Sequence, residues 1–62
     1  MSATLTRREE QVLGLVRRGL TNSEIAAELE IATRTVGKHL EHVYEKLETS
    51  TRTGALARWN PS

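Results

Sequence analysis

The stretch Thr21–Leu47 reads TNSEIAAELEIATRTVGKHLEHVYEKL and predicts two helices joined by a tight corner. In the second helix, apolar residues recur at the spacing of a helix that is buried on one side: Val36, Leu40, Val43, Tyr44 and Leu47. At about 100° per residue, these side chains share one side of the helix. The opposite side is charged and can be presented to a partner; it carries Arg34, Lys38, Glu41 and Glu45.

Two capping boxes predict where the helices before the corner begin. In Thr6-Arg7-Arg8-Glu9 and in Thr21-Asn22-Ser23-Glu24, the threonine hydroxyl and the glutamate carboxylate can each accept the backbone amide of the other residue. Gly19 suits the end of the first helix, because glycine tolerates the left-handed conformation that is common there. The side chains expected to face the core are Val12, Leu13, Leu15 and Val16 in the first helix and Ile25, Ala26 and Leu29 in the second.

Polar residues mark the start of the third helix and of a fourth. Either Thr33 or Ala32 can cap the third helix, and Thr33 is preferred because alanine has no side-chain oxygen. Ser50 or Thr51 can cap a fourth helix over residues 52–59, which Pro61 ends. The predicted fold class is all-α, with four short helices and a central helix-turn-helix.

Length and composition restrict the chain to one small domain over residues 1–62. A core of this size leaves little room for a cofactor, and we expect none. The absence of cysteine excludes disulfides and thiolate metal sites. No apolar run approaches the roughly 20 residues of a membrane span, and Met1–Thr4 lacks the features of a signal peptide. We therefore expect a cytoplasmic protein with no membrane partner.

No residue pattern predicts catalysis, a metal site or a small-molecule ligand. His39 and His42 lie three residues apart, but zinc needs at least three protein ligands and no third is placed beside them. The serines and threonines near helix starts have capping roles, and the chain has neither a nucleophile elbow nor a phosphate-binding glycine loop. We expect a protein that is not an enzyme.

The net charge of +1 argues only weakly for a nucleic-acid partner, so the distribution of charge matters more. All charges within residues 21–31 are acidic, and basic residues lie before and after this segment. Arg34 and Lys38 by themselves fit a solvated helix face as well as a DNA contact, and the helix-turn-helix spacing favours DNA. The basic residues of the first helix are interpreted as solvated surface residues and are left out of the site: Arg7, Arg8, Arg17 and Arg18.

Motifs along nearly the whole chain carry a resemblance to a known family. They are Leu5-Thr6-x-Arg8-Glu9 with Val12-Leu13-x-Leu15, Gly19-Leu20-Thr21-Asn22-x-Glu24-Ile25-Ala26 with Leu29, Thr35-Val36-x-x-His39, Val43-Tyr44-x-Lys46-Leu47, and Arg52-Thr53 with Ala55. On these residues the chain resembles the LuxR-type helix-turn-helix domain. That domain is the DNA-binding module at the carboxyl end of many bacterial response regulators and quorum-sensing activators.

The resemblance implies sequence-specific binding of double-stranded DNA in transcription regulation, with the third helix as recognition helix in the major groove. It also implies a homodimer formed through the fourth helix. The implied dimer residues are Ala55, Leu56 and Trp59. The implied DNA-binding residues are Asn22, Ser23, Thr33, Arg34, Thr35, Lys38, Glu41, His42, Lys46 and Arg52. Among these, Lys38 and Glu41 would face base edges, whereas His42 and Lys46 would reach the DNA backbone.

Four positions depart from the residues that are usual in this family. Gly37 stands in place of a lysine, Glu41 in place of a basic or polar residue, Ala32 in place of a serine, and Glu48 in place of the glycine after the third helix. Fewer cations and an acidic recognition surface lead us to expect weaker and more salt-sensitive DNA binding than in a well-charged relative.

Two alternatives keep the same fold. In the first, Gly37, Glu41 and Glu45 disable the DNA-binding surface, and the third or fourth helix binds a protein instead. In the second, the chain resembles region four of sigma factors, which would make RNA polymerase its partner. The opening Leu5-Thr6-x-Arg8-Glu9 and the position of Asn22 favour the LuxR type.

Overall fold

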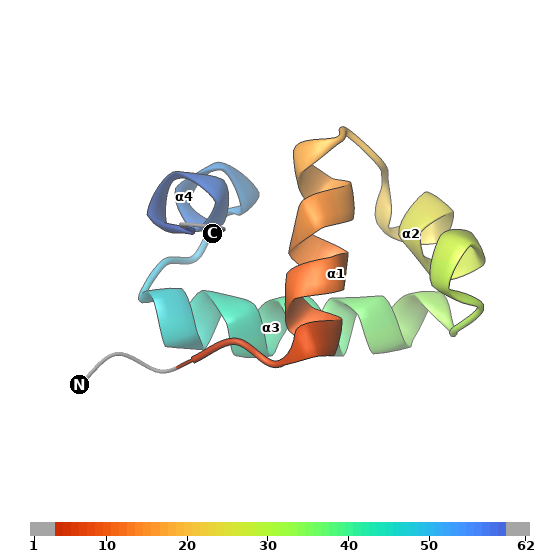
Figure 1. Cartoon of the computed structure of the whole chain (residues 1–62), viewed down its shortest axis with the longest axis horizontal. Helices are drawn as coiled ribbons and strands as arrows, with labels where there is room; N and C mark the ends of the chain where they lie inside the picture. Colours follow the sequence, from red (N-terminus) through yellow and green to blue (C-terminus); the bar gives the residue numbers. More distant parts are fainter. Residues whose placement is uncertain (1–3, 60–62) are drawn as a thin grey trace.

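The computed structural model describes residues 4–59, and within them the chain forms four α-helices and no strand. The helices are α1 (Arg7–Arg17), α2 (Asn22–Leu29), α3 (Thr33–Leu47) and α4 (Arg52–Arg58). Figure 1 shows α1 crossing over α3, with α2 and α4 above the two ends of α3. The predicted all-α fold with a central helix-turn-helix, α2 and α3, is confirmed.

Both predicted capping boxes are present. The Thr6 hydroxyl accepts the Glu9 amide at 3.1 Å, and the Glu9 carboxylate accepts the Thr6 amide at 2.8 Å. The same pair of bonds joins Thr21 and Glu24 at 3.2 and 2.8 Å. These bonds satisfy backbone amides that have no partner within the helix, so local sequence alone sets where α1 and α2 begin.

Three of the helices end in the same way, with one residue in the left-handed conformation. These residues are Gly19 after α1 (φ 91°), Glu30 after α2 (φ 58°) and Glu48 after α3 (φ 56°). In each case the following amide bonds back to a carbonyl five residues earlier: Leu20 to Leu15 at 3.2 Å, Ile31 to Ala26 at 3.0 Å, and Thr49 to Tyr44 at 3.0 Å. The predicted end of α1 at Gly19 is confirmed. Glu48 occupies the position where the family usually has a glycine, whereas no feature of the sequence marks Glu30 for this conformation.

The cap of α3 differs from the preferred prediction. Ala32 is the N-cap residue and makes no side-chain bond, while Thr33 is already helical. The turn between α2 and α3 explains this difference. The left-handed Glu30 reverses the chain there, and the helical conformation resumes at Thr33. The assignment of the cap to Thr33 is therefore wrong by one residue.

The start of α4 agrees with the prediction, since Thr51 is its N-cap residue and accepts the Gly54 amide at 2.9 Å. The helix ends at Arg58, one residue before the predicted end, because Trp59 is extended. Pro61, predicted to end this helix, lies outside the described residues.

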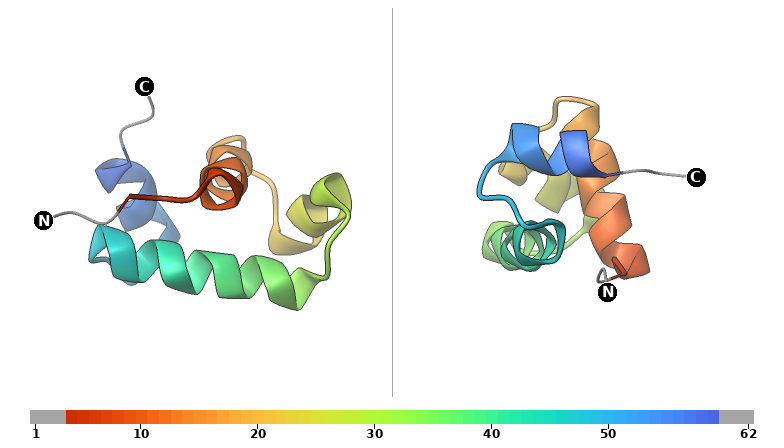
Figure 2. Two further views of the ribbon diagram at one scale, coloured as in Figure 1. Left: turned by 60° about the horizontal axis from the view of Figure 1, so that its bottom comes forward. Right: turned by 90° about the vertical axis from the view of Figure 1, so that its left-hand side faces the viewer.

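The core lies where α1, α2 and α4 meet the inner side of α3. Its buried apolar residues are Val12, Leu13, Leu15, Val16, Ile25, Ala26, Val36, Leu40, Val43 and Ala55. The predicted inward residues of α1 are all among them, and Tyr44 and Leu47 of α3 are half-buried at its edge. Figure 2 shows the consequence, which is that α3 forms one edge of the molecule and the other helices all lie on its inner side.

Candidate nucleic-acid interface

The outer side of α3 is uncovered and charged. Arg34, Lys38, Glu41 and Glu45 are all exposed, and both views in Figure 2 leave this side of α3 without a neighbouring helix. Over 15 residues, α3 is about 22 Å long, and an α-helix with its side chains is about 10–12 Å across, which fits the major groove of B-DNA, about 12 Å wide. The amino half of the surface is basic and the carboxyl half is acidic, as the sequence predicts.

The charged groups on this surface have no partner within the described part of the chain. Across residues 4–59 the structure has a single ion pair, between Lys46 and Glu9, and Arg34, Lys38 and Glu41 take no part in it. Lys38 and Glu41 lie three residues apart yet are not paired with one another. Their hydrogen-bonding capacity is therefore available to a partner.

The first turn of α3 also has free backbone amides. Ala32 offers no side-chain oxygen to cap them, whereas the Thr35 and Val36 amides bond to the Ala32 carbonyl at 3.0 and 3.2 Å. Thr33 and Arg34 are exposed at this end, and Thr35 is half-buried. Free amides and the positive end of the helix dipole favour a phosphate, which supports the placement of Thr33 and Thr35 near the DNA backbone.

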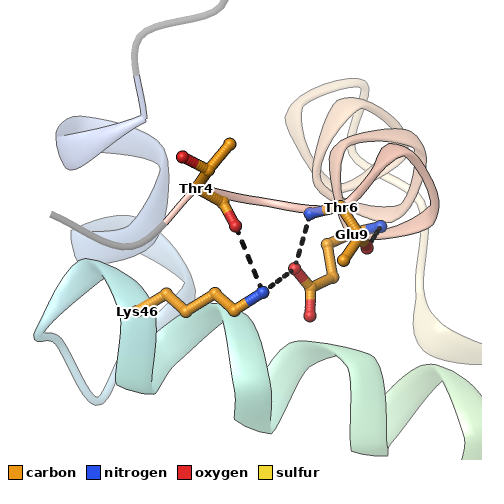
Figure 3. Close-up of polar contacts among 4 residues, drawn as sticks. All are labelled: Thr4, Thr6, Glu9 and Lys46. Atoms are coloured by element: carbon orange, nitrogen blue, oxygen red, sulfur yellow. Dashed lines mark hydrogen bonds and ion pairs between the residues drawn. The ribbon is translucent and has the colours of Figure 1, made fainter.

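Lys46 is held within the chain. Its ammonium lies 2.7 Å from Glu9 Oε1 and 3.2 Å from the Thr4 carbonyl oxygen, and Figure 3 shows it between α3 and the start of α1. Glu9 is only 4% exposed, and the Glu9 carboxylate also accepts the Thr6 amide. Lys46 thus joins the end of α3 to the first turn of α1, a link that the predicted contact with the DNA backbone did not anticipate.

The pKa of the Glu9 carboxyl reflects this environment. Burial by itself raises the pKa, because it penalises the charged form. Hydrogen bonds from Lys46 and from the Thr6 amide, together with the positive charge of Lys46, outweigh burial and hold the pKa of Glu9 below its usual value. Glu9 is therefore a buried carboxylate that stays ionised, and Lys46 is its counter-ion.

Arg52 and Asn22, both predicted to bind DNA, contact one another. The Arg52 guanidinium donates to Asn22 Oδ1 at 2.7 Å and to the Leu20 carbonyl at 2.8 Å. These bonds join the start of α4 to the connection between α1 and α2. Ser23 and His42, also predicted to bind DNA, are exposed and have no such link within the described residues.

The predicted dimer residues on α4 fall into two groups. Ala55 is 0% exposed and packs in the core, so it has no surface to offer a second copy, and its assignment to a dimer interface does not fit the structure. Leu56 and Trp59 are half-buried. The Trp59 ring lies over the Arg17 guanidinium, with 5.0 Å between Cζ and the ring centroid, and is near Gly14. Trp59 thus covers α1 and is itself partly exposed.

Other kinds of site have little support in the described residues. Residues 4–59 contain no group of three or more histidine or acidic side chains placed to hold a metal ion. An open groove of about 390 Å³ lies between α1 and α2, where Gly14, Leu15 and Leu29 are among its lining residues, and it does not include the outer side of α3. None of the described helices is both long and apolar enough to cross a membrane.

Comparison with known proteins identifies the domain. The family model described as bacterial regulatory proteins, luxR family, matches residues 3–58. The chain belongs to the LuxR family. A crystal structure of the response regulator ChrA, from a heme-sensing two-component system, superposes with a TM-score of 0.87 at 38% sequence identity. The match covers 94% of this chain and 29% of ChrA, so this LuxR-family domain spans less than a third of that protein.

Membership of the LuxR family makes this domain a DNA-binding module of transcription regulation rather than an enzyme. It also favours the LuxR-type interpretation over a relationship to sigma region four.

Proposed function

We propose that this domain binds double-stranded DNA sequence-specifically by placing α3 in the major groove. The observation that carries the proposal is the outer side of α3, which is uncovered, about 22 Å long and lined with charged groups that have no partner within residues 4–59. In this arrangement Lys38 and Glu41 face base edges. Arg34, Thr33 and Thr35 contact phosphates at the amino end of the helix, where the backbone amides are free.

Ser23 and His42 complete the proposed DNA surface as exposed polar groups beside the groove. We assign Lys46, Asn22 and Arg52 a different role, because each already has a close polar partner inside the domain. They hold α1 and α4 against the helix-turn-helix and thereby orient α3. These bonds use two of the three N–H donors of Lys46 and two of the five of Arg52, so part of their hydrogen-bonding capacity is already committed within the domain.

This assignment changes the expected salt dependence. The slope of log K against log salt is about −0.9 per phosphate neutralised, so Arg34 and Lys38 give a slope of about −2 per protomer and about −4 for a dimer. If Lys46 and Arg52 also neutralised phosphates, a dimer would show a slope of about −7. Fewer phosphate contacts make DNA binding weaker but less salt-sensitive. The expectation from the sequence was weaker and more salt-sensitive binding, so its second part is revised.

The proposal includes a homodimer that binds two half-sites about one helical turn apart. The exposed parts of Leu56 and Trp59 on α4 are the surface offered to the second copy. A dimer with two-fold symmetry requires a DNA site with two-fold symmetry, so the two half-sites should be related by the same symmetry.

The test is fluorescence anisotropy against short duplexes enriched from a random pool by repeated binding. We expect a two-fold-related motif to be enriched and the winning duplex to show a salt slope near −4. If no duplex is enriched and binding stays undetectable even at low salt, α3 is not a DNA-binding surface in this chain. The interaction-module alternative, in which α3 or α4 binds a protein, then takes its place.

A further inference from the structure

Glu41 is an unusual residue to find at the centre of a DNA-binding surface. It is exposed on the outer side of α3 and has no ion pair within residues 4–59, whereas the Glu9 and Glu24 carboxylates are both engaged in capping boxes. A carboxylate in the major groove is repelled by every phosphate. The groups there that it can accept from are the amino groups on the base edges, above all N4 of cytosine.

The spacing along α3 places Glu41 next to the neighbouring base. Three residues separate it from Lys38, which corresponds to about 4.5 Å along the helix axis. Successive bases on one strand are about 3.4 Å apart. When Lys38 faces the edge of one base pair, Glu41 is therefore level with the next base pair.

Nothing at Gly37 obstructs the Glu41 side chain. Side chains on an α-helix lean toward its amino end, so Glu41 leans over the preceding turn, where Gly37 stands. Gly37 has no side chain, and a Cβ built there would meet nothing within 4 Å. The Glu41 carboxylate can therefore reach toward the amino half of α3, which is the half that enters the groove in helix-turn-helix complexes.

We propose that Glu41 selects cytosine at one position of each half-site by accepting a hydrogen bond from its N4 amino group, next to a guanine contacted by Lys38. This inference rests on the proposed function, since it needs α3 in the major groove. In this proposal Glu41 is more than a charge that repels phosphate: it excludes bases other than cytosine at its position. Lys38 donates to O6 or N7 of the guanine, so the two residues together favour a G/C-rich core in the half-site.

The chain offers a matched pair of variants to test this. Glu41→Gln and Glu45→Gln each remove one negative charge from the same exposed side of α3, four residues apart. Both therefore relieve repulsion from phosphate by a similar amount, but only Glu41 is close enough to the amino half to contact a base. The measurement is selection of duplexes from a random pool, followed by titration of single-base variants of the winning site at one salt concentration.

We expect the wild-type domain to prefer cytosine at one position of each half-site by roughly 5- to 150-fold. In Glu41→Gln the preference at that position should move to adenine, because glutamine donates to N7 and accepts from N6 of that base. Glu45→Gln should tighten binding to all duplexes by the same factor and keep the cytosine preference.

Two results would overturn the inference in distinguishable ways. If both variants tighten binding equally and neither alters base preference, Glu41 acts only as a repulsive charge, and α3 still binds DNA. If the wild-type domain binds no duplex at all, the proposed function itself fails. Equal circular dichroism spectra and melting temperatures of the three proteins show that differences in binding do not come from unfolding.

Discussion

The link between Lys46 and Glu9 predicts an unequal cost of removing its two ends. Lys46→Met keeps the apolar stem of the side chain but leaves the Glu9 carboxylate, whose side chain is 5% exposed, with only the Thr6 amide as a donor. Breaking a buried ion pair costs about 3–5 kcal/mol. Because the Lys46 side chain is 27% exposed and the Thr6 bond remains, we expect a loss of about 2–3 kcal/mol.

Removing the charge of Glu9 should destabilise the domain less than removing that of Lys46. Glu9→Gln keeps an oxygen that can accept the Thr6 amide, and the Lys46 ammonium can still reach water, so we expect a loss of about 1 kcal/mol. A domain of 62 residues has a total stability of roughly 3–9 kcal/mol. Lys46→Met therefore removes a large share of it, with a fall in melting temperature of about 10–20 °C.

Urea unfolding followed by circular dichroism measures both losses, and the double variant measures their coupling. We expect the double variant to cost about 1–2 kcal/mol less than the sum of the single variants. Lys46→Met should also leave the salt slope of DNA binding unchanged when measured well below its melting temperature. A slope reduced by about one unit per protomer would instead show that Lys46 contacts phosphate.

The pH dependence gives an independent check. Since the pKa of Glu9 is lowered by folding, its contribution is fully present above the unfolded pKa, about 4.3, and is lost as pH falls through the lower folded value. The stability difference between the wild type and Glu9→Gln should therefore shrink as the pH falls from about 5 through the lowered pKa of Glu9. A difference that is constant with pH, or a Lys46→Met variant no less stable than Glu9→Gln, would refute the reasoning.

Four further predictions concern the backbone and DNA binding. A Cβ at Gly54 would collide with the Thr49 hydroxyl and crowd the cap of α4, so Gly54→Ala should cost about 1–3 kcal/mol of stability. A Cβ at Gly37 meets open space, so Gly37→Ala should stabilise α3 by up to about 1 kcal/mol. Thermal melting measures both changes. Glu48→Gly should raise stability by about 1 kcal/mol in urea unfolding, because Glu48 adopts the left-handed conformation. Lys38→Ala should weaken binding to the selected duplex more than to a scrambled one in anisotropy titrations, and an equal loss on both would make Lys38 a phosphate contact.

Most of the fold could be predicted from the sequence because its determinants are local. A capping box needs only residues three apart, and the inner side of α3 needs only the period of the helix. The corner after α2 was harder to predict. Its left-handed residue is Glu30, and a glutamate gives no sign of this conformation, so the cap of α3 was placed one residue too late.

The candidate site also contains residues that local sequence predicts and residues whose role depends on long-range contacts. Arg34, Lys38 and Glu41 were placed correctly on the exposed side of α3 because periodicity alone determines which side of a helix a residue faces. The resemblance to the LuxR-type domain assigns Lys46 and Arg52 to DNA, whereas the structure shows each of them bonded within the domain. Their partners Glu9 and Asn22 lie 37 and 30 residues away in sequence, a separation over which a motif carries no information.

These long-range links explain how a domain with so few buried residues fixes the direction of its recognition helix. Among residues 4–59 only ten apolar residues are buried, and Ala55 is the single one of them contributed by α4. Leu56 and Trp59 also pack against the edge of the core, and the Arg52 bonds to Asn22 and to the Leu20 carbonyl add directional contacts that orient α4. Arg52 thus connects the helix proposed to pair with a second copy to the first turn of α2, the helix that supports α3. Because Lys46 and Arg52 commit part of their donors in this way, we assign the contacts with DNA to the residues on the outer side of α3.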